Sequence, residues 1–416
     1  MSSVAADSAA PLRVAIVHDW LVTLAGAEWV LRDLLLAFPD ATVFTTIDHM
    51  ADQDRAALAL PPTRTTWLQG VPGISRHYRA YLPAMPWAVS GHDLSGYDLV
   101  ISNSHAVAKG IRPHRDQRHV CYCLSPMRYA WDLREQYLRE ASLDGPLLGP
   151  PARLMLNALR RWDRTTSARV DRFLTLSSYI ADRIARAYGR SAAVVYPPVD
   201  TEFFVPAAAD KDTGPVRVAG MSSAEEYYVT ASRFVPYKRV DMIAAAFRRL
   251  PGKRLVIVGA GPDEAKVRAA AGPNVTLVGH TSRAELRRWL QGARGFVFAA
   301  EEDFGIAPVE AQACGVPVIA YARGGAVETI RGADQADPTG EFYVEQSAEA
   351  LAEAIRRFEG RPWRSSGTAW MACRTNALRF ARPRFRDEIR AAILAPPRGS
   401  DRSMGPGGFE PPHVGL

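Results

Sequence analysis

Short apolar runs alternate with longer amphipathic stretches along most of the chain. The first run, Arg13-Val14-Ala15-Ile16-Val17, is rich in β-branched residues, which is typical of a buried strand. A glycine-containing turn then opens a predicted helix, which runs from Ala25-Gly26-Ala27-Glu28 to about Ala37. A strand, a glycine turn and a helix in this order are the usual opening of a doubly wound α/β domain.

The alternation continues in two series. Further strands are predicted at 42–46, 97–102, 119–124, 172–176 and 193–196, and then at 227–232, 255–259, 275–279, 295–300, 317–321 and 341–344. Helices of the second series are predicted at 239–250, 263–271, 282–292, 308–314 and 347–359. We therefore expect an α/β protein of two doubly wound Rossmann-like domains, each with a parallel sheet, that face each other across a ligand-binding cleft.

Composition shifts divide the chain further. We expect a flexible leader at 1–12, a first domain at 13–205 and a linker at 206–226, which is rich in Pro, Gly and polar residues. The second domain should cover 227–362. A basic helical segment at 363–395 should return to the first domain, and the Gly- and Pro-rich tail at 396–416 should be disordered.

The totals exclude several classes of protein. The chain has 416 residues, 47% of them hydrophobic, and no apolar run or N-terminal segment resembles a membrane span or a secretory signal. Four cysteines are too few for a disulfide framework, and Cys121-Tyr122-Cys123 lacks the companions of a metal site. We expect a cytoplasmic protein with no bound metal and no cofactor.

The positive charge admits more than one kind of partner. The net charge is +7, but no nucleic-acid-binding module is recognisable, so we expect no nucleic acid partner. Residues 151–172 carry six arginines interleaved with leucines and Trp162. This segment is either a peripheral contact with the inner face of a membrane or an ordinary helix whose apolar stripe packs on the core.

The most informative stretch lies between two glutamates, Glu302 and Glu310. It follows the apolar run 295–300, and Pro308 suits the first position of a helix that should stop at Gly315. Glu302 would then lie on a strand-end loop and Glu310 on the first helical turn. The backbone N–H groups of Phe304, Gly305 and Ile306 would point outward at a helix N-terminus and could bind a phosphate.

Two more strand-end loops should lie near this stretch. One carries Arg233 and Lys238, two cations that suit a diphosphate. The other carries Gly259 and Gly261, whose backbone could approach a ligand closely, although such a turn is weak evidence by itself. Cations for phosphates and carboxylates for hydroxyl groups together suit a nucleotide-activated sugar.

These motifs resemble those of family 4 glycosyltransferases of the GT-B fold, in particular bacterial mannosyltransferases of O-antigen and exopolysaccharide synthesis. The resemblance covers roughly residues 13–385 and rests chiefly on the two-glutamate stretch and on Ser232-Arg233-Phe234-Val235-Pro236-Tyr237-Lys238-Arg239. It implies metal-independent transfer of a hexose with retention at the anomeric carbon. The implied donor is GDP-mannose, with a UDP-sugar as the alternative, and the implied acceptor is a glycan or a polyprenyl-linked sugar.

The resemblance also implies residue roles. Arg233 and Lys238 would stabilise the departing diphosphate, and Glu302 with the backbone at 304–306 would hold the donor sugar. Glu310 would hold the ribose. Gly26 in the first loop would bring backbone close to the donor phosphate and the acceptor.

The sequence departs from the family at two places. Ala25 replaces a glycine, which restricts the dihedral angles of the first loop. Leu124 stands where relatives commonly have a histidine that reaches the sugar, and His105 is a candidate to replace that contact.

Three other readings remain open. A GT-A glycosyltransferase would need a metal-binding Asp-x-Asp, but Asp52-Gln53-Asp54 lies in a polar, helical stretch. A sugar-nucleotide epimerase of similar architecture would need a richer acid–base set. Leu124 makes a weakly active or non-catalytic sugar-nucleotide-binding protein a further alternative.

Overall fold

The computed structural model describes residues 11–132, 134–140, 143–207, 226–361, 363 and 369–396. Nearly all of the predicted leader at 1–12, linker at 206–226 and tail at 396–416 lies outside these residues. The chain forms two compact units, Met1–Val195 with Arg386–Leu416 and Tyr196–Phe385. Each unit is described by itself below.

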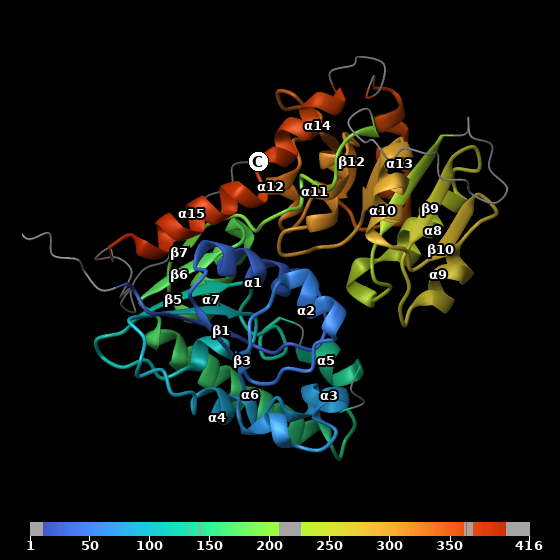
Figure 1. Ribbon diagram of the computed structural model, residues 1–416. Helices are drawn as coiled ribbons and strands as arrows, with labels where there is room; N and C mark the ends of the chain where they lie inside the picture. Colours follow the sequence, from blue (N-terminus) through green and yellow to red (C-terminus); the bar gives the residue numbers. More distant parts are fainter. Residues whose placement is uncertain are drawn as a thin grey trace, which may run out of the picture. The chain divides into compact units, whose positions relative to one another are not determined.

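Unit 1 is built on a seven-stranded sheet in the order β3-β2-β1-β4-β5-β6-β7, and its neighbouring strands pair in parallel (Figure 1). The strands are β1 Val14–His18, β2 Thr42–Thr45, β3 Thr63–Arg64, β4 Leu99–Ser104, β5 Arg118–Cys123, β6 Arg172–Thr175 and β7 Ala192–Val194. The helices are α1 Gly26–Ala37, α2 Asp52–Leu58, α3 Ile74–His77, α4 Met85–Val89, α5 Arg134–Glu140, α6 Gly149–Thr166 and α7 Ser178–Tyr188. Short 3₁₀ turns are η1 Trp67–Gly70, η2 Tyr78–Tyr81, η3 Ala108–Gly110 and η4 Ser167–Arg169.

Unit 2 contains a second parallel sheet of six strands, in the order β10-β9-β8-β11-β12-β13. The strands are β8 Tyr227–Ala231, β9 Arg254–Val258, β10 Val275–Gly279, β11 Gly295–Phe298, β12 Val318–Tyr321 and β13 Gly340–Tyr343. The helices are α8 Val240–Arg248, α9 Glu264–Ala270, α10 Arg283–Gly292, α11 Ile306–Ala313, α12 Ala326–Thr329, α13 Ala348–Glu359 and α14 Ala369–Leu378, with the 3₁₀ turn η6 Pro236–Lys238. The predicted fold class, with two parallel Rossmann-like sheets, is confirmed.

Some predicted boundaries were wrong for identifiable reasons. The strand predicted at 97–102 begins two residues later, because the Tyr97 N–H bonds to the Leu94 carbonyl and Asp98 pairs with Arg13. Helix α11 begins at Ile306, so Pro308 is its third residue rather than its first. The first turn of a helix has no internal partner for its N–H groups, so proline removes no hydrogen bond there either. The short elements β3 and α12 were not predicted.

The basic C-terminal segment forms two helices, α14 and α15 (Arg382–Leu394). Between them the Phe380 carbonyl accepts a bond of 2.8 Å from the Val199 N–H, which takes this backbone out of the helix. Helix α15 belongs to unit 1 from Arg386 onward. There Arg172 donates to the carbonyls of Ala392 and Ala395 at its last turn, at 2.9 and 3.2 Å, and so caps the helix end.

The basic segment 151–172 consists of α6, η4 and the start of β6, so Arg172 is a strand residue and not part of the helix. Ala152, Leu156 and Leu159 of α6 are buried in the core of unit 1, which accounts for most of the apolar stripe. Leu154 is 71% exposed. In the described part of the chain, no helix is long and apolar enough to cross a membrane.

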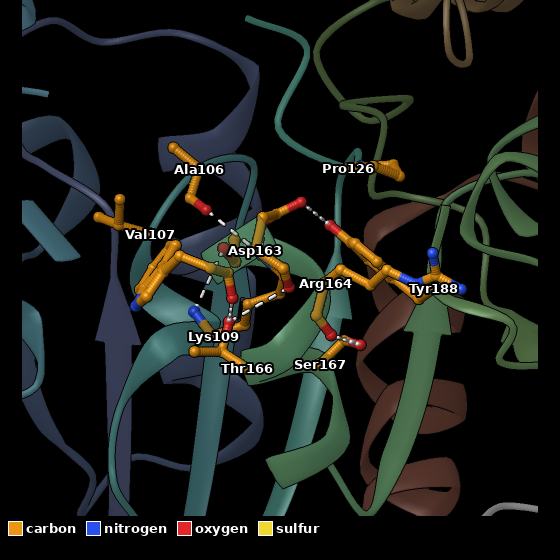
Figure 2. A network of polar contacts seen from close by, with 12 residues as sticks. Ala106, Val107, Lys109, Pro126, Asp163, Arg164, Thr166, Ser167 and Tyr188 are labelled. Carbon is orange, nitrogen blue, oxygen red and sulfur yellow. Dashed lines mark hydrogen bonds and ion pairs between the residues drawn. The ribbon is translucent and has the colours of Figure 1, made fainter. Parts of the chain in front are cut away.

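A buried ion pair joins η3 to α6 inside unit 1 (Figure 2). The Lys109 ammonium contacts Asp163, whose other carboxylate oxygen accepts bonds of 2.8 Å from Trp131 Nε1 and from the Tyr188 hydroxyl. Burial lowers the pKa of Lys109, but attraction to Asp163 outweighs it and holds the pKa above its ordinary value. Four segments distant in sequence therefore meet at one carboxylate.

Removing one partner of this pair should destabilise the protein more than removing both. Lys109→Met or Asp163→Leu leaves an uncompensated buried charge and should each lower the free energy of unfolding by about 3–5 kcal/mol. The double variant should lie closer to the wild type, as measured by chemical denaturation. Arg268→Met, which breaks an exposed pair with Glu264, is the control and should cost at most about 1 kcal/mol. Additive losses in the double variant would contradict the coupling.

Candidate functional site

The strand order of each sheet reverses at one place. In unit 2 the chain starts at β8, adds β9 and β10 on one side, and then crosses to add β11 on the other side. In unit 1 it starts at β1, adds β2 and β3, and then crosses to β4. Ligands of open α/β sheets bind at the carboxyl ends of the strands that flank such a switch point. The relevant positions are therefore the loops after β8 and β11 and those after β1 and β4.

In unit 2 these two loops bring Lys238 and Glu302 into contact. Lys238 ends η6, which follows β8, and Glu302 lies on the loop after β11. Their side chains form an ion pair, with 19% and 18% of the side-chain surface exposed. Arg233 is exposed on the same loop as Lys238. The structure thus brings together two of the three predicted catalytic residues.

The glycines after β9 have a role in loop contacts. A Cβ at Gly259 would lie 1.9 Å from the Ser232 carbonyl oxygen, and one at Gly261 would lie 2.4 Å from the Phe234 oxygen. The Phe234 N–H also donates to the Ala260 carbonyl at 3.0 Å. Both glycines are therefore needed to hold the β8 loop in place, whatever they do toward a ligand.

The stretch at 304–306 offers backbone groups only. Gly305, at φ +86°, precedes the first helical residue, Ile306. A helix N-terminus therefore follows Gly305, although α11 begins two residues before the predicted position 308. The Phe304 side chain is buried, with its ring centroid 5.4 Å from that of Phe380. Its predicted contribution to a site therefore comes from the main chain.

A further pair of glycines lies against Glu302 and was not assigned a role from the sequence. A Cβ on Gly324 would lie 2.3 Å from the Glu302 carbonyl oxygen, and the Gly325 N–H donates to the same oxygen at 2.8 Å. The close approach fixes the backbone of the carboxylate loop. The adjacent glycines at 324 and 325 were the signal in the sequence.

Glu310 on α11 is partly buried, and its environment differs from that of Glu302. Burial raises the pKa of its carboxyl to about 7, an effect reinforced by Asp200 and opposed by Arg283 and Arg382. Asp200 itself pairs with Arg283 at 2.9 Å and with Arg382 at 3.1 Å. These three charged residues were not predicted as part of the site, because they come from three separate segments.

At the switch point of unit 1, Asp19 follows β1 and is fully buried. Its carboxylate accepts bonds from four consecutive backbone N–H groups after β4, those of residues 105 to 108, at 2.6–3.1 Å. It also lies 2.9 Å from His105 Nδ1. Burial opposes its ionisation, but His105 and the backbone donors hold the pKa of Asp19 well below its usual range.

His105 is therefore a fixed imidazole at the end of β4. Its side chain is 26% exposed, and its ring stands edge-on to Trp20 with the centroids 4.8 Å apart. Burial lowers the pKa of His105, but the Asp19 carboxylate outweighs burial and raises it. With Nδ1 directed at Asp19, Nε2 is the nitrogen left for another partner.

The loop that leads into α1 tolerates its alanine. Ala25 has φ −142° and ψ −165°, an extended conformation that any residue adopts, so the loss of the family glycine causes no strain. The Glu28 carboxylate accepts a bond of 2.8 Å from the Ala25 N–H and lies 3.4 Å from His18 Nε2. Gly26, the first residue of α1, is held beside this buried acid.

Leu124 directly follows β5 and is buried. Its N–H donates to the Ser104 carbonyl at 2.8 Å, so its backbone is bonded to the residue that precedes His105. The residue that departs from the family pattern thus lies next to the histidine suggested as its replacement.

Two family models match the chain. The model for "Glycosyltransferase Family 4" matches residues 24–203, and the model for "Glycosyl transferases group 1" matches residues 217–365. Together they span most of the sequence, one for each half. The chain belongs to the family 4 glycosyltransferases.

Curated relatives of this glycosyltransferase include two mannosyltransferases. The GDP-mannose-dependent monoacylated alpha-(1-6)-phosphatidylinositol monomannoside mannosyltransferase of Corynebacterium glutamicum is 28% identical over 240 residues, 52% of this chain and 63% of the relative. The GDP-mannose-dependent alpha-(1-6)-phosphatidylinositol monomannoside mannosyltransferase of Mycobacterium tuberculosis is 34% identical over 199 residues, 43% and 50% of the two chains. The matches thus span about half to three fifths of these relatives.

The fold is also that of solved glycosyltransferase structures. The crystal structure of HepE from Anabaena, in complex with UDP and glucose, superposes with a TM-score of 0.64 at 17% identity. The match covers 92% of this chain and 99% of the other. At this identity the similarity shows that the two proteins share a fold, and it says nothing about the substrate of this glycosyltransferase.

Replacing Glu310 should stabilise the empty enzyme at high pH. Because its pKa is raised in the folded state, the native protein holds this proton more tightly than the unfolded chain, and stability falls as pH rises from about 4.5 to about 7. Glu310→Gln removes this penalty and should raise the free energy of unfolding at pH 8 by about 1–3 kcal/mol, with little change at about pH 4.5.

Urea denaturation at the two pH values measures this difference. Glu353→Gln, on the exposed side of α13, is the matched control and should shift stability little at either pH. A Glu310→Gln variant that is destabilised equally at both pH values would refute the assigned burial of the charge.

Proposed function

We propose that the protein is a retaining, metal-independent glycosyltransferase that moves mannose from GDP-mannose to a glycan or polyprenyl-linked acceptor in polysaccharide synthesis. The names of the two relatives support the donor, since both are GDP-mannose-dependent mannosyltransferases. The structural neighbour holds UDP and glucose, so a UDP-sugar is the alternative donor.

The contact between Lys238 and Glu302 at the switch point of unit 2 carries this proposal. In the empty site the two charges compensate each other. A bound donor would supply a diphosphate for Lys238 and Arg233 and sugar hydroxyl groups for Glu302. One site would thereby exchange an internal ion pair for contacts with both halves of a nucleotide sugar.

The proposed reaction breaks the bond between the anomeric carbon and the diphosphate oxygen and forms a bond from that carbon to the acceptor oxygen on the same face. The acceptor proton passes to the departing phosphate oxygen. Arg233, Lys238 and the N-terminus of α11 stabilise the negative charge that develops there, so the chemistry needs preorganised positive charge and not a protein nucleophile.

Other residues would bind the parts of the donor that do not react. Glu310 would accept hydrogen bonds from the ribose hydroxyl groups, and hydrogen bonds donated to a carboxylate favour its ionised form. Gly259 and Gly261 would hold the β8 loop that presents the cations. Gly26 would admit the donor phosphate and the acceptor beside the first helix of unit 1.

His105 would supply the imidazole that Leu124 cannot. Its fixed orientation by Asp19 and its place at the switch point of unit 1 support a hydrogen bond from Nε2 to the donor sugar or the acceptor hydroxyl. Because Leu124 cannot form a hydrogen bond with its side chain, a second candidate function is a sugar-nucleotide-binding protein with weak or no turnover.

The exposed arginines of α6 and the exposed Leu154 support a peripheral contact with an anionic membrane, where a polyprenyl-linked acceptor would be found. Such a contact would place the enzyme at the cytoplasmic face of the membrane.

Lys238→Ala and Glu302→Ala should each abolish most transfer while the fold stays intact. Loss of one electrostatic group that stabilises the leaving group typically lowers kcat by about 10²–10³-fold. The rate of GDP release from GDP-mannose, without added metal, measures the effect. Arg249→Ala removes a partner of the exposed pair with Glu349 and is the control, with near wild-type turnover. Near-normal turnover in both site variants would sink the site assignment.

His105→Asn should lower kcat about 10–100-fold, the cost of one or two lost hydrogen bonds to a polar group, with the dissociation constant of the donor unchanged. His77→Asn, at an exposed position of the same unit, is the control. Donor binding without turnover in the wild type, with turnover gained by Leu124→His, would instead support the binding-protein alternative.

A further inference from the structure

A small cavity of about 140 Å³ lies in unit 1, apart from the loops after β1 and β4. Three segments line it: the loop after β5, α6 and α7. The lining residues are Pro126, Trp131, Asp132, Arg160, Arg183, Arg186 and Ala187. The cavity has room for several water molecules but is smaller than the roughly 300 Å³ at which pockets for whole drug-sized ligands begin.

The cavity carries an excess of positive charge. Arg183, whose side chain is 7% exposed, forms an ion pair with Asp132, so one of the three guanidinium groups is compensated. The other two, Arg160 and Arg186, form no hydrogen bond or ion pair with any residue that the structure describes. Two uncompensated cations thus share one small cavity with an ion pair whose arginine is buried and whose aspartate is half exposed.

The side chain of Arg160, in one wall of the cavity, is held in place by a residue of the buried network. The Arg160 guanidinium lies over the Trp131 ring, 4.2 Å from its centroid. Trp131 Nε1 donates to Asp163 at 2.8 Å, and Asp163 is the carboxylate that also binds Lys109 and Tyr188 (Figure 2). The buried network therefore orients the ring on which Arg160 stacks. Because the guanidinium is already held there, it would lose less conformational entropy on binding a ligand.

We propose that this cavity binds a phosphoryl group. A planar guanidinium matches two phosphate oxygens at once, and the separate helices α6 and α7 present Arg160 and Arg186 to the same space. The volume of about 140 Å³ suits one tetrahedral oxyanion. The chemical class of the ligand is therefore a phosphate monoester, a diphosphate end or inorganic phosphate.

The place of the cavity suggests which molecule carries the phosphate. Pro126 lies two residues beyond Leu124, at the carboxyl end of β5, and β5 neighbours β4, whose end carries His105. A phosphate held here would belong to an acceptor such as a polyprenyl diphosphate-linked sugar. This identity rests on the proposed function, whereas the phosphoryl site itself does not. The second source is free inorganic phosphate.

The phosphoryl site is tested by titrating the full-length protein with inorganic phosphate in low-salt buffer, by calorimetry. Arg160→Gln/Arg186→Gln should weaken binding at least tenfold. Arg161→Gln/Arg164→Gln removes two exposed arginines of α6 that do not line the cavity and should leave binding unchanged. Arg233→Gln/Lys238→Met removes the cations of unit 2 and should also leave this binding event intact.

No phosphate binding by the wild type, or an equal loss in the Arg161/Arg164 control, would overturn the proposal. Thermal unfolding of each variant shows whether it is folded, and all four positions are exposed. Because the titration needs no turnover, a protein that lacks transferase activity can still give either result.

A second titration distinguishes the two sources of phosphate. Geranyl diphosphate is added to protein saturated with inorganic phosphate. Competition between the two, lost in Arg160→Gln/Arg186→Gln, supports an acceptor phosphate. Independent binding assigns the cavity to free phosphate. Geranyl diphosphate that displaces phosphate equally well from the Arg160/Arg186 variant would contradict the assignment of the cavity.

Discussion

The reversal of strand order in a parallel sheet is the constraint on which the candidate site residues of each unit depend. A crossover helix covers the ends of consecutive strands, but where the chain leaves β3 for β4, or β10 for β11, two neighbouring strands send their loops in opposite directions. Backbone groups in the diverging loops need hydrogen-bond partners outside the sheet. In unit 1 the buried Asp19 carboxylate accepts hydrogen bonds from four backbone N–H groups of the loop after β4. In unit 2 an ion pair between Lys238 and Glu302 connects the loops after β8 and β11. The architecture creates the positions, and the side chains at these positions decide the chemistry.

Charge is buried in this molecule in two different ways. Asp163 and Asp19 are fully satisfied, by one cation with two neutral donors in the first case and by backbone donors with an imidazole in the second. Such groups organise their surroundings and resist change. Glu310 is different, because its carboxyl is partly buried with a pKa raised to about 7, and its neighbouring arginines are already paired with Asp200. Satisfied charges are the framework, and the incompletely satisfied one marks a position where a ligand can contribute.

Much of the fold followed from the sequence because apolar periodicity is a local signal. The runs that became β10, β11 and β12 were recognisable from β-branched and aromatic residues alone, and so were the glycine and proline residues around α11. The chemistry of the strand-end loops was also visible where both residues of a pair lay in distinct motifs, as with Lys238 and Glu302. The contacts of Asp19 were not visible, since its donors lie 86 to 89 residues away and are backbone groups without a side-chain signature. The cluster of Asp200, Arg283 and Arg382 was not predicted, because its members come from three separate segments of the chain.

The glycines at 259 and 261 change what such a turn can be taken to mean. Each is required because another segment of the same domain passes closer than a side chain allows, with distances of 1.9 and 2.4 Å to the nearest carbonyl oxygens. Selection on foldability alone would then preserve these positions in a descendant that had lost its substrate. A Gly-x-Gly turn in a chain of this architecture thus indicates a shared fold and not an activity. The side chains of the neighbouring loops are what distinguish an active enzyme from an inactive relative.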